Sequence, residues 1–231
     1  MLEELEQFLL QDIELYGDAQ IPRSALVVDA DLQTYAAEAA PWQGAETLDA
    51  LDLAIRSCMK CSLGKLRHQF VFGEGNPNAR ILLVGEAPGA DEDRLGRPFV
   101  GEAGELLTKM LAAIGLQRSD VYICNLLKCR PPRNRDPLPE EIAFCRPYLF
   151  KQIELINPLT ILCLGRFAAQ SLLNTDEAIS NLRQKWFTFN KAFVLVTYHP
   201  AALLRSPQYK RPAWEDLQLF KQKLVELGIC S

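Results

Sequence analysis

The chain has 231 residues, of which 48% are hydrophobic and 23% are charged, so it is long enough to bury a full core as one α/β domain with a small appendage. The charged fraction and the lack of a long apolar run in the sequence exclude a disordered chain and a membrane-spanning one. The acidic start, MLEELEQFLL, lacks the basic region of a secretory signal, so we expect a cytoplasmic protein with no membrane association.

Acidic and basic residues are divided unevenly along the chain. Residues 1–52 hold twelve acidic residues and one basic residue, a net charge of −11, whereas residues 53–231 hold 24 basic and 17 acidic residues, a net charge of +7. Phosphate would repel the acidic segment, so it should lie away from any nucleic-acid face, and a solvated helical tail is its plainest interpretation. We expect an acidic, partly helical extension over residues 1–45 and a functional domain over residues 46–231.

Apolar spacing predicts the elements in chain order. Residues 2–13 have the pattern of a short amphipathic helix, residues 22–42 form a linker rich in Pro and Ala, and a second helix begins at Thr47 as N-cap and runs to Cys58. Four short apolar runs follow, with helical patterns at 106–114, 142–153 and 217–227; the runs are residues 81–84, 121–127, 160–164 and 193–197. Such runs, separated by helical patterns, are typical of buried parallel strands in an α/β sheet.

Each of the four predicted strands ends in residues that packing alone does not explain. The segments at these ends are GEAPG (85–89), NLLKCRPPRNR (125–135), GR (165–166) and YHPAALLR (198–205). Glycine lets the backbone approach a planar ligand closely, and Asn and His supply oriented donors and acceptors. Because ligands bind beyond the carboxyl ends of parallel strands, the sequence predicts a binding site there.

Four of the seven cysteines have the spacing of a metal centre. They are Cys58, Cys61, Cys129 and Cys145, which begin with a C-x2-C pair. Four thiolates suit either a structural zinc ion or a [4Fe–4S] cluster, and their spacing alone does not choose between the two. The widely separated second pair, which would join an N-terminal helix to a distant loop, favours iron. Cys124, Cys163 and Cys230 have ordinary core or terminal positions.

Several of these segments together resemble one family. GEAPGADED (85–93), GRPFVG (96–101), KCRPP (128–132) and HPA (199–201) are similar to motifs of the family 4, iron–sulfur-containing uracil-DNA glycosylases, and the likeness covers about residues 50–228. The resemblance implies a three-layer α/β/α fold with a central four-stranded parallel sheet. It also implies a monofunctional glycosylase that hydrolyses the N-glycosidic bond of uracil in DNA, the first step of base excision repair, and a [4Fe–4S] cluster on the four cysteines.

The resemblance also assigns roles to single residues. The first motif, with Glu86, Ala87 and Gly89, forms a wall of the uracil pocket and positions the water; other uracil glycosylases have Asp where Ala87 stands, so the group that activates the water is left open. For the base itself, Phe99 is expected to stack on uracil and Asn125 to read its polar edge. An amide offers a donor and an acceptor to O4 and N3–H, whereas cytosine presents the reverse pattern.

Three further residues are expected at the reaction centre. A neutral His199 would donate a hydrogen bond to the uracil oxygen on which negative charge develops, and such oxyanion stabilisation is commonly the largest catalytic contribution. Glu92 and Asn134 match polar residues near the scissile bond, although Glu92 at a helix N-terminus and Asn134 in a turn also fit structural roles.

DNA contacts are expected on two loops. Leu203 or Leu204 would wedge into the gap that the extruded base leaves, unless these leucines begin a buried helix, and Arg205 would anchor a phosphate. A second phosphate-facing patch would comprise Lys128, Arg130, Arg133 and Arg135. The expected partner is uracil-containing DNA, single- or double-stranded, bound by a monomer, and the sequence carries no signal that identifies a replication-clamp contact. The competing hypothesis is a non-catalytic iron–sulfur protein that binds DNA or transfers electrons.

Overall fold

The computed structural model describes residues 40–230, of which residues 41–230 form one compact unit. The helix expected at residues 2–13 and nearly all of the linker expected at 22–42 lie outside the described residues. Residues 41–45, which the sequence assigned to the extension, belong to the compact unit: Trp42 packs edge-on against Tyr148 with ring centroids 5.1 Å apart, and Ala45 is buried. The folded unit thus begins about five residues before the expected boundary.

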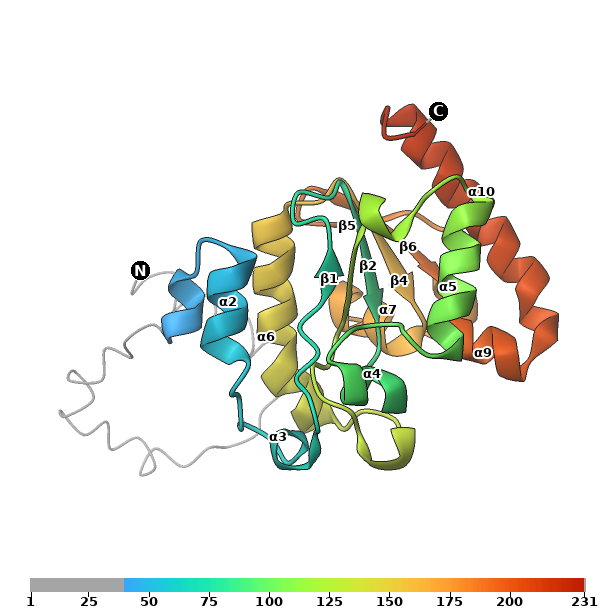
Figure 1. Cartoon of the computed structure of the whole chain (residues 1–231). Helices are drawn as coiled ribbons and strands as arrows, with labels where there is room; N and C mark the ends of the chain where they lie inside the picture. Colours follow the sequence, from blue (N-terminus) through green and yellow to red (C-terminus); the bar gives the residue numbers. More distant parts are fainter. Residues whose placement is uncertain (1–39, 231) are drawn as a thin grey trace, which may run out of the picture. The chain divides into compact units, whose positions relative to one another are not determined.

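One sheet runs through the middle of this unit (Figure 1). The strands are β1 (Glu74–Gly75), β2 (Ile81–Gly85), β3 (Tyr122–Asn125), β4 (Thr160–Leu164), β5 (Phe187–Phe189) and β6 (Ala192–Thr197). Their order is β1-β3-β2-β4-β6-β5, in which the four central strands are parallel and the two edge strands pair antiparallel. The four predicted strands are confirmed, and the sheet extends beyond them to six strands.

The helices vary widely in length. They are α2 (Leu48–Ile55), α3 (Leu63–Leu66), α4 (Ala90–Leu95), α5 (Glu102–Ala113), α6 (Pro139–Ile156), α7 (Arg166–Leu173), α8 (Ile179–Leu182), α9 (Pro200–Arg205) and α10 (Lys210–Glu226). Short 3-10 turns lie at Pro41–Gly44, Arg118–Asp120, Pro132–Asn134 and Pro207–Tyr209. Thr47 caps α2 as predicted, with its hydroxyl oxygen accepting a hydrogen bond from the backbone N–H of Ala50 at 3.2 Å. Among the described residues, the helices are all too short or too polar to cross a membrane.

The two faces of the sheet are covered by different helices, which gives the three-layer α/β/α architecture expected (Figure 1). Alternate residues of the central strands point to opposite faces. On one face Leu82 and Val84 join a core with α6, α7 and α8, and on the other Ile81 and Leu83 join a core with α5, α9 and α10. Burial on both faces explains why these strands are continuous apolar runs rather than alternating ones.

Candidate active site

The carboxyl ends of the parallel strands open into a cavity of about 480 Å³, within the range of small-ligand sites. Ten of the residues singled out from the sequence line it: Glu86, Ala87, Gly89, Glu92, Phe99, Asn125, Asn134, Arg135, His199 and Arg205. They come from the segments after β2, β3 and β6 and from the loop between α4 and α5. A larger groove, of about 730 Å³, lies beside α2 and contains none of the site residues singled out from the sequence.

Asn125 occupies the end of β3, directly opposite Gly85 at the end of β2. Its side chain is buried, and its Oδ1 has no hydrogen-bond partner within the described structure. A side chain at position 85 would collide with it, since an added Cβ would lie 2.3 Å from Oδ1 of Asn125. A buried acceptor without a partner is energetically costly, so this oxygen is set to accept a hydrogen bond from a ligand in the cavity.

Phe99 and His199 form the aromatic part of the cavity. Their rings stack with centroids 5.4 Å apart and planes inclined by 29°. Phe99 is only 5% exposed, and its ring also lies against Gly85, where an added Cβ would be 2.5 Å from Cζ. The ring that was expected to stack on a base is therefore next to the amide that was expected to read it.

His199 lies two residues after the end of β6 and is the N-cap of α9. Its Nδ1 accepts a hydrogen bond from the backbone N–H of Ala201 at 3.2 Å, which leaves the proton of a neutral ring on Nε2. Burial, with a smaller contribution from the positive charge of Arg205, lowers the pKa of His199 to about 4. The side chain is thus a neutral donor throughout the physiological pH range.

Glu86 is one of several carboxyl side chains that line the cavity, with Asp91, Glu92, Glu102 and Asp136. Burial raises the pKa of Glu86 to about 7, and the negative charge of Asp136 adds to this, while Arg166 and Arg205 oppose it. A carboxyl group with a pKa near neutrality suits proton transfer or water activation.

Glu92, in the first turn of α4, uses both carboxylate oxygens on backbone groups. Oε2 accepts from Gly89 N–H at 3.0 Å, and Oε1 accepts from the N–H groups of Val100 and Gly101 at 2.8 and 3.0 Å. The side chain lines the cavity but joins the first motif to the loop that carries Phe99. This arrangement favours a positioning role over direct contact with a substrate.

Asn134 lies at the rim of the cavity in a turn with unusual backbone. Both Arg133 and Asn134 have positive φ, 55° each, and the Oδ1 of Asn134 accepts a hydrogen bond from Nε of Arg130 at 2.8 Å. Arg135 does not face outward as an isolated charge, because it forms a two-pronged ion pair with the buried Glu141. Arg135 itself lines the cavity, while the neighbouring Arg130 is half-buried and Arg133 is exposed.

Comparison with known proteins agrees with this geometry. The family model described as "Uracil DNA glycosylase superfamily" matches residues 72–218. A type-4 uracil-DNA glycosylase of Archaeoglobus fulgidus is 50% identical over 181 residues, which are 75% of this chain and 91% of the relative. Relatives of the same name from Saccharolobus solfataricus and Thermotoga maritima are 46% and 42% identical, over 78% and 79% of this chain and 87% and 97% of their own lengths.

The chain belongs to the type-4 uracil-DNA glycosylases. This agrees with the family whose motifs the sequence resembles.

In this type-4 glycosylase the two leucines of α9 have different environments. Leu203 is 2% exposed and packs in the core beside α5 and α10, so it cannot reach DNA and the sequence-based expectation for it is corrected. Leu204, one residue later, is 42% exposed and Arg205 is exposed beside it. Successive helical residues point about 100° apart, which is why only one of the two can face outward.

Lys128 also departs from its expected place in the phosphate-facing patch. It is fully buried, and its ammonium group donates to the backbone oxygen of Asn125 at 2.7 Å and to Oε1 of Gln152 at 2.5 Å. Gln152 in turn donates to the carbonyl of Phe72 at 3.0 Å. Lys128 therefore supports the end of β3 from inside.

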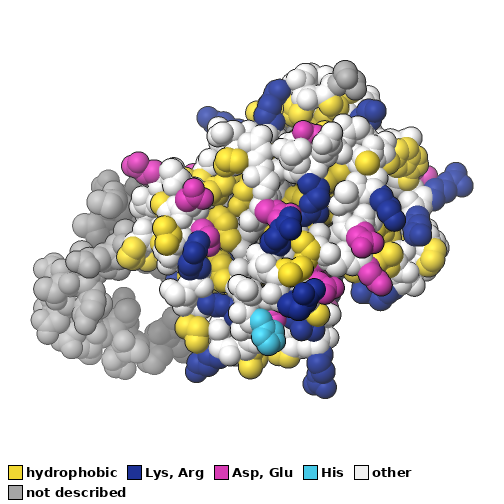
Figure 2. Space-filling model, in the orientation of Figure 1, with side chains coloured by type: hydrophobic (Ala, Val, Ile, Leu, Met, Phe, Trp, Pro, Cys, Tyr) yellow, Lys and Arg dark blue, Asp and Glu magenta, His cyan; other side chains and the backbone are white. Residues whose placement is uncertain are grey.

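Figure 2 shows Lys and Arg side chains interspersed with Asp and Glu on the visible face of the glycosylase rather than gathered in one stripe.

The four cysteines singled out from the sequence interact despite their separation along the chain. Burial raises the pKa of Cys129, with hydrogen bonding from Arg67 opposing this and the charges of Cys61 and Cys58 adding to it. Burial also raises the pKa of Cys145 to about 12, and Cys129 and Cys61 contribute to this. In the part of the chain that is described, no three His, Cys, Asp or Glu side chains lie close enough together to hold one metal ion.

Two polar side chains touch this cysteine quartet. Nη1 of Arg67 lies 3.2 Å from Sγ of Cys129, and the hydroxyl of Tyr148 lies 3.4 Å from Sγ of Cys58. Both groups donate hydrogen bonds, which stabilise thiolates. The donor set therefore fits a cofactor that takes four thiolates and compensates their charge.

Proposed function

We propose that this chain hydrolyses the N-glycosidic bond of uracil in DNA as a monofunctional glycosylase, the first step of base excision repair. The observation that carries the proposal is that two groups line the same cavity: the buried Oδ1 of Asn125, which has no hydrogen-bond partner in the described structure, and the neutral imidazole of His199. Uracil has an N3–H to donate to the first and a carbonyl oxygen to accept from the second. A non-catalytic iron–sulfur protein would have no use for this pairing, so the competing hypothesis is disfavoured.

Recognition of the base follows from the lining of the cavity. Uracil stacked on Phe99 presents N3–H to Oδ1 of Asn125, and its O4 accepts from the amide nitrogen of the same side chain. Cytosine has an acceptor at N3 and an amino group at position 4, so both contacts become unfavourable. A buried amide left unpaired discriminates strongly between such ligands.

Bond cleavage places positive charge on the sugar and negative charge on the departing uracil. Nε2–H of His199 donates to the uracil oxygen as this charge grows, which lowers the barrier without transfer of a proton to the ring. Glu86, ionised above about pH 7, holds the attacking water and stabilises the sugar cation. Within residues 40–230 no lysine lines the cavity, so the residues present favour water over an amine as the nucleophile.

Contacts with DNA surround the cavity. A base inside a duplex is out of reach and must be extruded before it can enter. Exposed Leu204 fills the gap, and Arg205, Arg130 and Arg133 bind phosphates. Asn134 positions Arg130 through their hydrogen bond. Since one chain supplies the whole cavity, we propose that a monomer acts on uracil in single- or double-stranded DNA.

We also propose that Cys58, Cys61, Cys129 and Cys145 hold a [4Fe–4S] cluster. Arg67 and Tyr148, which donate hydrogen bonds to Cys129 and Cys58, would offset part of the negative charge that four thiolates bring together. When bound, the cluster would cross-link the segment between α2 and α3, the loop after β3, and α6. No disulfide joins any of the seven cysteines within residues 40–230, which agrees with a reducing compartment, and we place the protein in the cytoplasm.

Two measurements test these proposals. The purified protein is incubated with end-labelled oligonucleotides that differ only in one base, uracil, cytosine or thymine, and alkali then breaks abasic sites. Cleavage is expected at uracil alone, and intact uracil oligonucleotide with folded, cluster-loaded protein would favour the non-catalytic hypothesis. Protein prepared without oxygen is expected to be brown and to contain iron; a colourless protein with stoichiometric zinc would overturn the cluster proposal.

A further inference from the structure

The loop between α4 and α5 holds Phe99 in an unusual backbone conformation. Phe99 has φ of 53°, a left-handed value that bulky side chains rarely adopt and that persists only where the surroundings enforce it. The loop has little room to relax. An added Cβ at Gly104 would lie 1.8 Å from the carbonyl oxygen of Phe99, and one at Gly85 would lie 2.5 Å from its ring.

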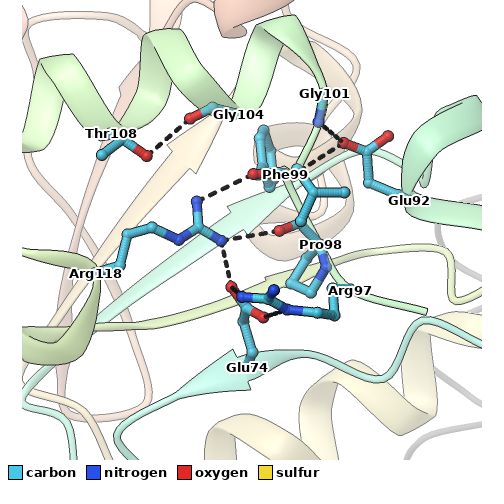
Figure 3. Close-up of polar contacts among 10 residues, drawn as sticks. Glu74, Glu92, Arg97, Pro98, Phe99, Gly101, Gly104, Thr108 and Arg118 are labelled. Carbon is cyan, nitrogen blue, oxygen red and sulfur yellow. Dashed lines mark hydrogen bonds and ion pairs between the residues drawn. The ribbon is translucent and has the colours of Figure 1, made fainter. Parts of the chain in front are cut away.

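Arg118, in the turn before β3, holds this loop by its carbonyl groups (Figure 3). Its Nη1 donates to the carbonyl oxygen of Phe99 at 3.1 Å, and its Nη2 donates to that of Pro98 at 2.9 Å. Glu92 holds the following N–H groups from the other side of the loop in the same view. Two charged side chains from separate segments thus fix four consecutive residues, 98–101.

Glu74 of β1 orients the guanidinium of Arg118. Its Oε1 accepts from Nη2 of Arg118, and its Oε2 accepts from Nε of Arg97 at 2.7 Å. The two arginines differ in a useful way. The side chain of Arg118 is 24% exposed and reaches the loop carbonyls, whereas that of Arg97 is 64% exposed and, within residues 40–230, hydrogen-bonds to Glu74 alone. A planar guanidinium can bond two carbonyls and a carboxylate at once, which an ammonium group does less well.

We propose that Arg118, oriented by Glu74, is a positioning residue that fixes the ring of Phe99 where an extruded uracil stacks. The inference rests on the proposed function, because it assigns the purpose of the fixed ring to base binding. Arg118 does not line the cavity, so it acts on the base only through Phe99. Loss of Arg118 should therefore weaken what the ring binds and leave phosphate contacts unchanged.

The test compares Arg118→Met with the matched control Arg97→Met, which removes the other arginine on Glu74. Two affinities are measured for each: the inhibition constant of free uracil, which needs the ring but no DNA, and the dissociation constant for DNA with an abasic-site analogue, which offers no base to stack. Arg118→Met is expected to raise the inhibition constant of free uracil at least tenfold and to change the dissociation constant for abasic-site DNA less than twofold. Arg97→Met is expected to change each of these two constants less than twofold.

A double-mutant cycle with Phe99→Ala separates positioning from general stability. If Arg118 acts through the ring, adding Arg118→Met to Phe99→Ala should change uracil inhibition less than twofold, and Arg118→Lys should recover part of the single-variant loss. Independent, multiplying effects would overturn the proposal, as would equal losses in Arg118→Met and Arg97→Met. If Arg118→Met does not fold, Glu74→Gln takes its place in the same cycle. Failure of the wild-type protein to release uracil would contradict the proposed function instead, and that control is run first.

Discussion

The variant His199→Ala tests most directly whether His199 stabilises the leaving uracil. Nε2 is the donor toward the leaving uracil, and removal of one preorganised oxyanion donor costs about 2.7–4 kcal/mol, or roughly 100- to 1000-fold in rate. The variant also loses the stacking contact with Phe99, 5.4 Å between centroids, for which about 0.5–1.5 kcal/mol is typical. We therefore expect single-turnover excision to fall by at least 100-fold, with DNA affinity reduced far less.

The same side chain has a structural role, which two further variants separate from the chemical one. Nδ1 caps α9 by accepting from Ala201 N–H, and loss of an N-cap typically costs about 0.5–2 kcal/mol of stability. His199→Asn retains a capping acceptor but is too short to donate from the position of Nε2, whereas His199→Gln carries an N–H near that position. His199→Asn should be stable and slow, and His199→Gln should recover part of the rate.

The assay is single-turnover cleavage of a uracil duplex, with affinity and thermal melting measured in parallel. A His199→Ala enzyme that binds weakly but cleaves its bound substrate at the wild-type rate would refute the donor role. So would a fully active His199→Asn enzyme, because capping alone would then account for the residue. In either case the leaving-group contact would pass to Asn134 or to the backbone of the first motif.

Three more changes have distinct expected outcomes. Asn125→Asp removes the amide donor and should lower uracil excision at least about 100-fold while narrowing the uracil-to-cytosine ratio, measured on matched duplexes. Leu204→Ala should slow excision from duplex DNA more than from single strands, with a free energy of unfolding within about 0.5 kcal/mol of wild type. Leu203→Ala should instead lower the free energy of unfolding by about 2–5 kcal/mol and leave the ratio of duplex to single-strand excision rates unchanged. The excision rate should rise as pH passes about 7, where Glu86 ionises, and Glu86→Gln should flatten that pH–rate profile. Because the pKa of Glu86 is higher in the folded protein than in the unfolded chain, ionisation of Glu86 destabilises the fold. Glu86→Gln should therefore raise the free energy of unfolding more at pH 8 than at pH 5.

The parallel strands were predictable because burial on both faces leaves a signal that needs no tertiary context. Each is a run of four to six residues in the structure, bounded by turn sequence. The edge strands β1 and β5 contain two and three residues, too few for any periodicity to register. Helices α4 and α9, with six residues each, fail to show a repeat for the same reason.

The residues of the cavity were predictable in kind but not always in role. Asn125 and His199 stand at strand ends, and the rule for parallel sheets places such residues together whatever the details of packing. Lys128 illustrates the limit, because a lysine within KCRPPRNR has the local setting of a phosphate contact. Only the fold brings Gln152, on α6, within hydrogen-bonding distance of its ammonium group, and that contact accounts for its burial.

The loop around Phe99 shows why a positioning residue such as Arg118 leaves no local signal. In GRPFVG the glycines are the residues expected to adopt left-handed backbone, and Gly96 does so with φ of 70°, but Gly101 does not and Phe99 does. A left-handed residue other than glycine costs about 1–3 kcal/mol, and hydrogen bonds to a charged group contribute about 1.5–3 kcal/mol each. The two bonds from Arg118 can therefore offset the strain. Because Arg118 lies 19 residues from Phe99 and 44 from Glu74, sequence windows around the motif contain the strained residue and Glu92 but neither Arg118 nor Glu74.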